Sequence, residues 1–403
     1  MRPVEPSSGC AYNRSISATG GDGLATTVTW EGLRDLALFR AENGCAISFY
    51  LDLDPSGSPT RGEVETRAHA LVDEIERSDM ATRARLTHEQ RQGLKDDAAR
   101  LRAFFEEDFS REGSHGFAVF CAGLDNLWRP LPLTERVPDL AKVGGALYLE
   151  PLVPLVGRGE GALVAVVGRE RGDLYRLSGG RLEELVEHFD EQPRRHDQGG
   201  WSQARFQRHV DKLVQDHLRD VAELIDRELR RSPGPRLVMV CAEETRTELE
   251  EALSHDARDA IVGWTAAEAH AGPAELLEVV EPVLDDWRAK QETSAVERWA
   301  EEVGRNGRAA AGWAATLEAA SDGRVDLLLF QNGAERAAWE CPACGRISLE
   351  AGACPLDGTR MEGTRDGLDL AVHQTLAHGG KVWALRERRD LEPVEGIGAL
   401  LRY

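Results

Sequence analysis

Two short cysteine motifs near residue 350 combine residue types and spacing that suit a metal ion. The first reads Cys-Pro-x-Cys-Gly from residue 341, and the second, Cys-Pro-x-Asp-Gly, begins at residue 354, after nine residues that follow the first motif's second cysteine. Glycine permits the tight turn in which backbone amides point at a thiolate, and two such turns facing each other form a tetrahedral zinc ribbon. We therefore predict a structural zinc with these ligands: Cys341, Cys344, Cys354 and Asp357.

The fourth ligand of this zinc has alternatives. Aspartate is less usual in that place than cysteine or histidine, so His373 or His378 is the alternative to Asp357. A ribbon that keeps both turns without a metal is the alternative to bound zinc. Nothing indicates an open coordination position. The expected role of the zinc is therefore structural, to cross-link a short insertion that has no hydrophobic core of its own.

A glycine pair in the middle of the chain lies within a locally basic stretch. The sequence GGWSQARFQR covers 199–208, and six Lys or Arg stand against three Asp or Glu between 194 and 219. This reversal of sign, in a chain of net charge −21, fits contact with phosphate groups. An aromatic side chain flanked by cations can hold an unpaired base. The candidate RNA-binding residues are Trp201, Arg194, Arg195, Arg205, Arg208 and Lys212. An ordinary loop before a solvated helix is the alternative.

Composition limits the classes of protein that the chain can belong to. Its 403 residues predict two or three domains, and the negative charge argues against a general coat for DNA. No apolar run is long enough to span a membrane, and the N-terminus lacks the apolar core of a signal peptide. Seven cysteines, four of them scattered, indicate reduced thiols. We expect a cytoplasmic protein that has no membrane partner.

The pattern of residues predicts a tail and three α/β domains. Small polar residues predict a disordered tail over 1–28. The expected domains are an N-terminal one at 29–155, a central one with the Gly-Gly loop at 156–272, and a C-terminal one at 273–403. The C-terminal domain carries the cysteine-rich insertion, at 339–360.

Individual elements follow from local periodicity. In the N-terminal domain, apolar runs predict strands at 45–55, 115–122 and 146–156, and helical spacing predicts helices between 62 and 109. In the central domain, two apolar runs flanking a Gly-Asp turn at 172–173 predict a hairpin.

The rest of the central domain predicts a layered core. A helix of about 28 residues is expected after an N-cap at Ser202, and it ends before a buried strand at 236–242. Glu243 and Glu244 begin a further helix, so the order of elements predicts three α/β layers. In the C-terminal domain we expect a helix, a turn and a strand over 313–330, then a helix near 368–376.

Several of these motifs resemble those of archaeal and eukaryotic class-I peptide-chain release factors. In that family, Gly-Gly-Gln is followed by Ser, two small or apolar residues, Arg, Phe, any residue and Arg, as in 199–208 here apart from the glutamine. The chain end EGIGALLRY (395–403) is similar to the family's glycine-rich C-terminal strand, and 313–330 is similar to the helix and strand that enter its last domain. The resemblance implies a three-domain release-factor-like α/β architecture, with a zinc-ribbon-like insertion in the C-terminal domain. The resemblance places the chain in the superfamily's bacterial branch, with relatives that include Pelota-like rescue factors and the hibernation protein Balon.

The loop departs from the family at the position of the catalytic glutamine, which is Trp201 here. Gln203 follows two positions later, and Gln198 precedes the glycines. The family's chemistry is attack of water on the ester of peptidyl-tRNA, for which a backbone amide aimed at the oxyanion is the main contribution of the protein. Gly199 and Gly200 could present that amide, and Gln203 or Gln198 would then order the water.

The resemblance therefore implies one of two activities at the ribosomal A site. The first is hydrolysis of P-site peptidyl-tRNA in ribosome rescue, and the alternative is a non-catalytic rescue or hibernation factor that occupies the site. The implied partners are the ribosome with its RNA, peptidyl-tRNA, and an elongation-factor-type GTPase that contacts the last domain. The Asn-Ile-Lys-Ser element for stop codons is absent from the sequence, which argues against codon-specific termination.

Overall fold

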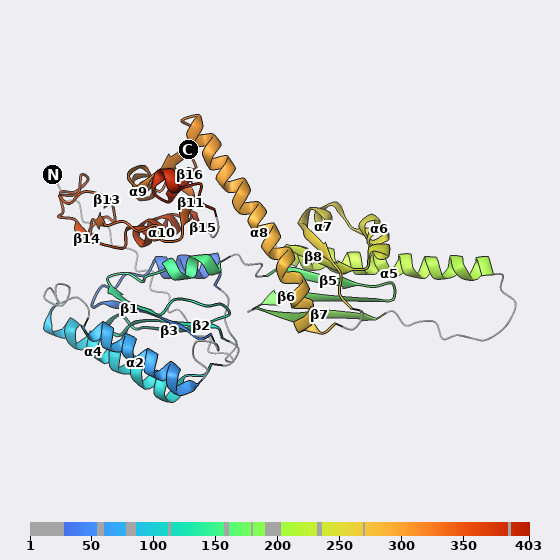
Figure 1. Ribbon diagram of the computed structural model, residues 1–403, viewed down its shortest axis with the longest axis horizontal. Coiled ribbons are helices and arrows are strands. Elements are labelled where there is room, and N and C mark those ends of the chain that lie inside the picture. Colours follow the sequence, from blue (N-terminus) through green and yellow to red (C-terminus); the bar gives the residue numbers. More distant parts are fainter. Residues whose placement is uncertain are drawn as a thin grey trace, which may run out of the picture.

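The computed structural model describes most of the chain. The described residues are 28–54, 60–77, 86–111, 114–156, 161–178, 180–189, 203–231, 236–268, 271–385 and 388–403, with side chains omitted for 186–189 and 203–211. We call 28–156 the N-terminal unit, 161–268 the central unit and 305–403 the C-terminal unit. Each contains a β-sheet, and one long helix, α8 (Pro273–Gly304), runs between the last two (Figure 1).

The N-terminal unit is an antiparallel sheet with a pair of helices on one face. The strand order is β3-β2-β1-β4, with these bounds: β1 Ala46–Asp52, β2 Gly116–Ala122, β3 Leu127–Leu133 and β4 Leu140–Gly144. The covering helices are α2 (Arg61–Arg77) and α4 (His88–Ala103), which continues as the π-turn η1 (Phe104–Asp108). Thr87 begins α4 in a capping box with Gln90, as its sequence favours.

The predicted strand at 146–156 is wrong. Glu150–Leu155 form a short 3-10 helix, η3, because Pro151 and Pro154 have no N–H to donate to a strand partner. Strands β3 and β4 were not predicted from the sequence. Strand β3 carries Pro130 and Pro132, which argue against a strand in sequence but are tolerated because β3 lies at the sheet edge.

The central unit has the three layers that its sequence predicts. The sheet order is β7-β6-β5-β8-β9, in which β5, β6 and β7 are antiparallel neighbours and β8 and β9 run parallel to β5. One face carries α5, α6 and α7, and the other carries the first half of α8. The bounds are β5 Leu163–Val167, β6 Arg171–Ser178, β7 Arg181–Phe189, α5 Gln203–Arg231, β8 Leu237–Cys241, α6 Glu243–Ala252, α7 His255–Ala260 and β9 Ile261–Thr265.

Two glycines let the helices approach this sheet closely. A Cβ on Gly172 would lie 2.5 Å from Val221 Cγ2 of α5, and one on Gly263 would lie 2.4 Å from Val283 Cγ1 of α8. Gly172 is therefore a packing residue of β6, where it pairs with Val167, and the predicted Gly-Asp turn at 172–173 is wrong. The hairpin itself is confirmed, and its turn lies at 168–170 between β5 and β6. Strand β7 was not predicted from the sequence.

Helix α8 belongs to two cores. Leu276, Val280 and Leu284 in its first half pack on the central sheet. Val296 and Trp299 in its second half pack on the C-terminal sheet. The helix that starts at the predicted boundary of 273 thus connects two units instead of opening one. Within the described ranges, no helix is both long and apolar enough to cross a membrane.

The C-terminal unit is a mixed sheet between α8 and a helix pair. Its strand order is β10-β16-β11-β15, with α9 and α10 on the face opposite α8. The bounds are β10 Ala309–Ala311, α9 Trp313–Ser321, β11 Val325–Gln331, α10 Gly367–Ala377, β15 Lys381–Leu385, η4 Glu392–Val394 and β16 Ile397–Leu401. Trp299 lies against Gly398, where a Cβ would be 2.7 Å from its Nε1, and donates from that atom to Ala310 O. This close contact explains a glycine within the chain's last strand.

The N-terminal and C-terminal units share one core. The N-terminal sheet turns its second face, with α1 (Trp30–Ala37), toward α9 and α10, and the buried side chains of both units form a continuous cluster. A polar network crosses this interface. Asp369 Oδ1 of α10 accepts hydrogen bonds from the Leu149 and Glu150 N–H groups, at 2.8 and 3.1 Å, at the start of η3. One turn later, His373 bonds through Nε2 to Leu147 O.

The charge state of His373 follows from its surroundings. Burial, with Arg40 nearby, lowers its pKa to about 4, so the ring is neutral near pH 7. Its Nε2–H then donates to Leu147 O, and Nδ1 accepts from Arg40 Nη1 at 3.1 Å. Asp369 and His373 of α10, together with Arg40 of the N-terminal unit, thus fix the relative position of the two units.

Candidate functional site

The predicted catalytic loop lies outside the described residues. This applies to Gln198, Gly199, Gly200 and Trp201, to Arg194 and Arg195, and to the expected N-cap Ser202. Gln203, Arg205 and Arg208 belong to the first turns of α5, but their side chains are outside the description. Lys212 is described, and it is exposed on α5. The roles assigned to these residues stay predictions.

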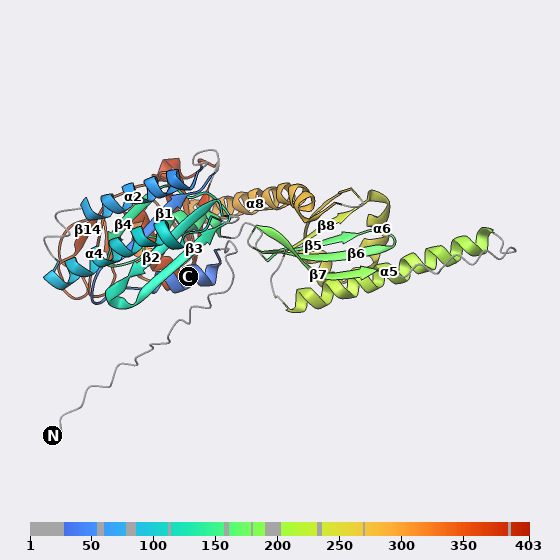
Figure 2. The ribbon, with the colours of Figure 1, turned by 90° about the horizontal axis from the view of Figure 1, so that it is seen from below.

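Helix α5 holds the residues that directly follow the loop away from the body of the protein. Among its described side chains, which start at Lys212, the buried ones include Val214, Leu218, Val221 and Ile225, which pack on the central sheet. The end at Gln203 projects beyond that sheet, on the side away from the N-terminal and C-terminal units (Figure 2). At 1.5 Å per residue, the helix extends about 16 Å past Val214. The Gly-Gly pair is thus joined to the free end of a long helix.

The other end of α5 is anchored by polar contacts. Glu228 is buried, and its carboxylate lies 2.6 Å from Arg231 Nη1 and 3.6 Å from Arg176 Nη2 of β6. Asp226 accepts a hydrogen bond from Ser254 Oγ, at 2.6 Å. With the apolar contacts, these bonds join the C-terminal part of the helix to both β6 and the start of α7.

The four predicted metal ligands come together in the cysteine-rich insertion. The insertion forms a small sheet of order β13-β12-β14, with β12 at Ala338–Glu340, β13 at Ile347–Ser348 and β14 at Glu362–Thr364. The ligand atoms of Cys341, Cys344, Cys354 and Asp357 all lie within 4.8 Å of one another. Cys344 Sγ and Cys354 Sγ are 3.5 Å apart, and Cys341 Sγ is 3.4 Å from Asp357 Oδ2. Ligands of a tetrahedral zinc, with bonds of about 2.0–2.3 Å, are separated by about 3.3–3.8 Å.

The two turns that supply the ligands have the same backbone geometry. In the first, Cys341 N donates to Arg346 O and Gly345 N donates to Cys341 O; in the second, Cys354 N donates to Thr359 O and Gly358 N to Cys354 O. Gly345 and Gly358 have positive φ values of 73° and 75°, which favour glycine. Asp357 therefore occupies, in the second turn, the position of Cys344 in the first.

Asp357 is ready to act as an anionic ligand. Its Oδ1 accepts a hydrogen bond from Thr359 N–H at 2.8 Å, and bonding to Thr359 lowers the pKa of the carboxyl to about 2. The two histidines that were the alternative fourth ligands, His373 and His378, lie outside this cluster. His373 is buried in the interface between units, and His378 Nδ1 bonds to Gln374 O within the end of α10. Among the described residues, only the four predicted ligands form such a group.

Three chemical features of the fold were not predicted from the sequence. One is the interface network around Asp369. Another is the contact between Arg40 and His373, which are 333 positions apart in the sequence. The third is a pocket beside α8 in which Arg236 stacks on Trp287. No local motif marks any of them, because each depends on segments that only the fold brings together.

Comparison with known proteins gives related sequences over most of the chain. Residues 148–285 match the family model described as bacterial archaeo-eukaryotic release factor family 10. Peptide chain release factor subunit 1 of Archaeoglobus fulgidus is 27% identical over 297 residues, which cover 68% of this chain and 72% of that relative. A Mycobacterium tuberculosis protein described as uncharacterized is 23% identical over 348 residues, covering 83% of this chain and 91% of the relative. Among solved structures, a model of ribosome-bound archaeal Pelota and ABCE1 is 16% identical with a TM-score of 0.41. The match covers 72% of this chain and 77% of the matched chain.

Proposed function

Since the chain belongs to the release-factor-like superfamily, in its bacterial branch, we propose that it is a cytoplasmic translation factor that enters the ribosomal A site and hydrolyses P-site peptidyl-tRNA in ribosome rescue. The observation that carries this proposal is the position of α5. Its end at Gln203, three residues after Gly200, lies about 16 Å along the helix from Val214 and projects beyond the central sheet. A narrow projection of this kind suits insertion of a loop among RNA strands.

The acidic body and the basic loop carry opposite charges, and they therefore interact differently with RNA. The chain carries −21 charges, whereas the stretch 194–219 is locally basic. RNA phosphates attract the loop and repel the rest of the surface, so contact is restricted to one end of the molecule. Exposed Lys212 is the described cation of this stretch nearest to the free end of α5.

The proposed reaction requires little from the protein. Water attacks the ester carbonyl carbon, the bond to the ribose oxygen breaks, and that oxygen leaves with a proton as the ribose hydroxyl. A backbone amide of Gly199 or Gly200 donates to the oxyanion, and Gln203 or Gln198 orders the water. The ribosome holds the ester in position, which supplies most of the orientation.

A second candidate function rests on Trp201, which stands where the family has its catalytic glutamine. Its indole is large enough to fill the place of the attacking water and can stack on a nucleotide base. In this alternative, the protein occupies the A site of idle or stalled ribosomes and leaves the ester intact.

We also propose that the cysteine-rich insertion binds one structural zinc. Three thiolates and one carboxylate suit this ion, and four protein ligands leave no position open for water or substrate. When bound, the metal would supply a cross-link between the two turns. Gly345 and Gly358 shape the two turns that would hold it, and the Thr359 N–H orients Asp357.

The test of the main proposal is release of labelled peptide from peptidyl-tRNA in the P site of ribosomes with an empty A site. We expect release by the wild type, and a loss of about tenfold or more in Gly200→Ala and Gln203→Ala. Gln215→Ala, an exposed position on the same helix, is the control that should release normally. If the wild type binds ribosomes, but releases no peptide, and Trp201→Ala weakens that binding, the non-catalytic alternative replaces the hydrolase. Absence of ribosome binding contradicts both.

The GTPase partner implied by the family is a separate prediction. We expect the full chain to co-sediment with ribosomes more strongly when an elongation-factor-type GTPase and a non-hydrolysable GTP analogue are present. The expected contact is the C-terminal unit, as in the resemblance described above. Equal sedimentation with and without every such GTPase would contradict the partner, while leaving the release assay unaffected.

A further inference from the structure

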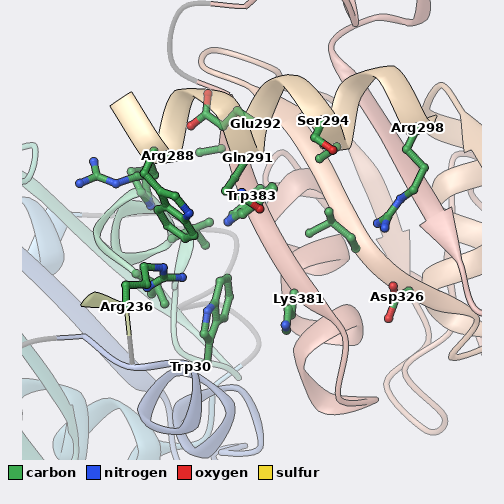
Figure 3. Close-up of a pocket in the computed structure, with 17 residues that line it drawn as sticks. Trp30, Arg236, Arg288, Gln291, Glu292, Ser294, Arg298, Asp326, Lys381 and Trp383 are labelled. Carbon is green, nitrogen blue, oxygen red and sulfur yellow. The ribbon is translucent and has the colours of Figure 1, made fainter. Parts of the chain in front are cut away.

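A pocket lies where the three units meet alongside α8. Its walls come from α1 (Trp30), the segment before β8 (Arg236), the middle of α8, and the edge of the C-terminal sheet at β15, with Lys381 and Trp383 (Figure 3). Its volume is about 390 Å³, within the range of small-molecule sites. None of its lining residues belongs to the cysteine cluster or to the predicted loop.

The pocket is positively charged in a strongly acidic protein. Four cations line it, against two acids, Glu292 and Asp326. The cations are Arg236, Arg288, Arg298 and Lys381. Since the chain as a whole carries −21 charges, this local excess is unusual and favours an anion.

Two of the arginines are only partly compensated. The Arg236 guanidinium lies 3.8 Å from the centre of the Trp287 ring, and no carboxylate pairs with it among the described residues. Arg288 pairs with Asp285 through Nη1, at 3.0 Å, but within that part of the chain its buried Nε has no hydrogen-bond partner. Burial lowers the pKa of both groups, and Arg288 lowers that of Arg236 further. Partly buried positive charge that is incompletely paired is costly, and a bound anion would relieve part of that cost.

Aromatic side chains accompany the cations. Trp30 and Trp383 line the same pocket and are half-buried, and Trp287 supports Arg236. Flat indole surfaces bind aromatic rings by stacking, and guanidinium groups bind phosphate through paired N–H donors. The combination of both in one cavity suits a ligand that carries a base and a phosphate.

We propose that this pocket binds a free mononucleotide, with Arg236 and Lys381 at the phosphate and Trp383 or Trp30 against the base. A volume of about 390 Å³ favours a single nucleotide over a longer RNA strand. The proposal does not depend on the ribosomal function. Because the walls belong to three units, the bound nucleotide would contact all of them and raise the stability of their arrangement.

The test is calorimetric titration of the full chain with AMP and GMP, compared with adenosine and with inorganic phosphate. We expect one saturable site for at least one mononucleotide, with adenosine and phosphate each weaker by about tenfold or more. Arg236→Gln and Lys381→Gln should each weaken binding about tenfold, and Trp383→Leu should weaken it as well. Lys290→Gln, an exposed cation on α8 outside the pocket, is the matched control and should bind normally.

Two results would overturn the proposal. One is the absence of saturable binding for every mononucleotide, even if an RNA oligonucleotide binds. The other is wild-type affinity in both Arg236→Gln and Lys381→Gln. Lys381 is exposed, so its replacement should leave the thermal midpoint of the ligand-free protein unchanged, and a loss of affinity there cannot be assigned to misfolding.

Discussion

Asp369→Ala is expected to lower the free energy of unfolding of the joined N-terminal and C-terminal units by about 2–4 kcal/mol. The carboxyl group is buried, and it accepts two hydrogen bonds from the Leu149 and Glu150 amides that begin η3. Removing it leaves both amides without a partner inside the interface, and each unsatisfied buried donor costs about 1–3 kcal/mol. Urea denaturation at pH 6, followed by tryptophan fluorescence, is the measurement.

The neighbouring Asp366 provides the matched control for this substitution. It also links the two units, through Lys142 Nζ at 2.8 Å, but both side chains are about one-third exposed. Solvent screens such a pair, so Asp366→Ala should cost less than about 1 kcal/mol. Equal losses in the two variants would contradict the capping role of Asp369.

Asp369→Asn separates the hydrogen bonds from the charge. Its amide oxygen can still accept from both N–H groups, so we expect most of the stability to remain. Burial raises the pKa of Asp369 from 3.8 to about 7, which means that the folded protein holds this proton more tightly than the unfolded chain does. The contribution of Asp369 to stability therefore falls as pH rises from about 4 to 7, and the asparagine variant should gain on the wild type over that range.

The pH dependence of His373 has the opposite sign. Its lowered pKa favours the folded state progressively as pH rises from about 4 to 6.5. Because His373 is present in both the wild type and Asp369→Asn, its contribution largely cancels in their difference. A difference in unfolding free energy that does not change between pH 4 and 7 would contradict the assigned titration of Asp369.

Local periodicity predicted the elements that are long or uniformly apolar. Helix α5, the buried strands β1, β2 and β8, and the three layers of the central unit followed directly from it. The failures had local causes. Prolines concealed β3, and the apolar run at 146–156 resembled a strand although its own prolines favour η3. Gly172 resembled a turn residue, although it is glycine because Val221 lies against it.

The candidate sites also differed in whether a local sequence pattern could predict them. The cysteine cluster was predictable because its ligands lie within seventeen consecutive residues and their spacing sets the turn geometry. The contact between Asp369 and Leu149 joins residues 220 positions apart, and no pattern around either predicts it. Arg236 and Trp287 likewise belong to different elements, and the pocket that they line exists only where three units meet.

Removal of the metal is the second large effect that we expect. The purified chain should contain one zinc ion, and chelation should unfold the ribbon at 338–364, because its own buried core is limited to Cys341, Cys354 and Met361. The main C-terminal sheet should remain folded, since its core extends well beyond the insertion. Hydrogen exchange with and without chelator measures both, and unchanged protection of the ribbon would contradict a metal staple.

Substitutions at the ligands test the equivalence of the two turns. Cys354→Ser should lose the metal, whereas Cys241→Ser, a half-buried cysteine outside the cluster, should keep one zinc per chain. Asp357→Cys should retain zinc and bind it more tightly, because its position matches that of Cys344 and the change completes a four-thiolate site. Asp357→Ala should weaken zinc binding. If Asp357→Ala and Asp357→Cys bound zinc equally well, Asp357 would not be a ligand, and the metal would be held by the three cysteines and water.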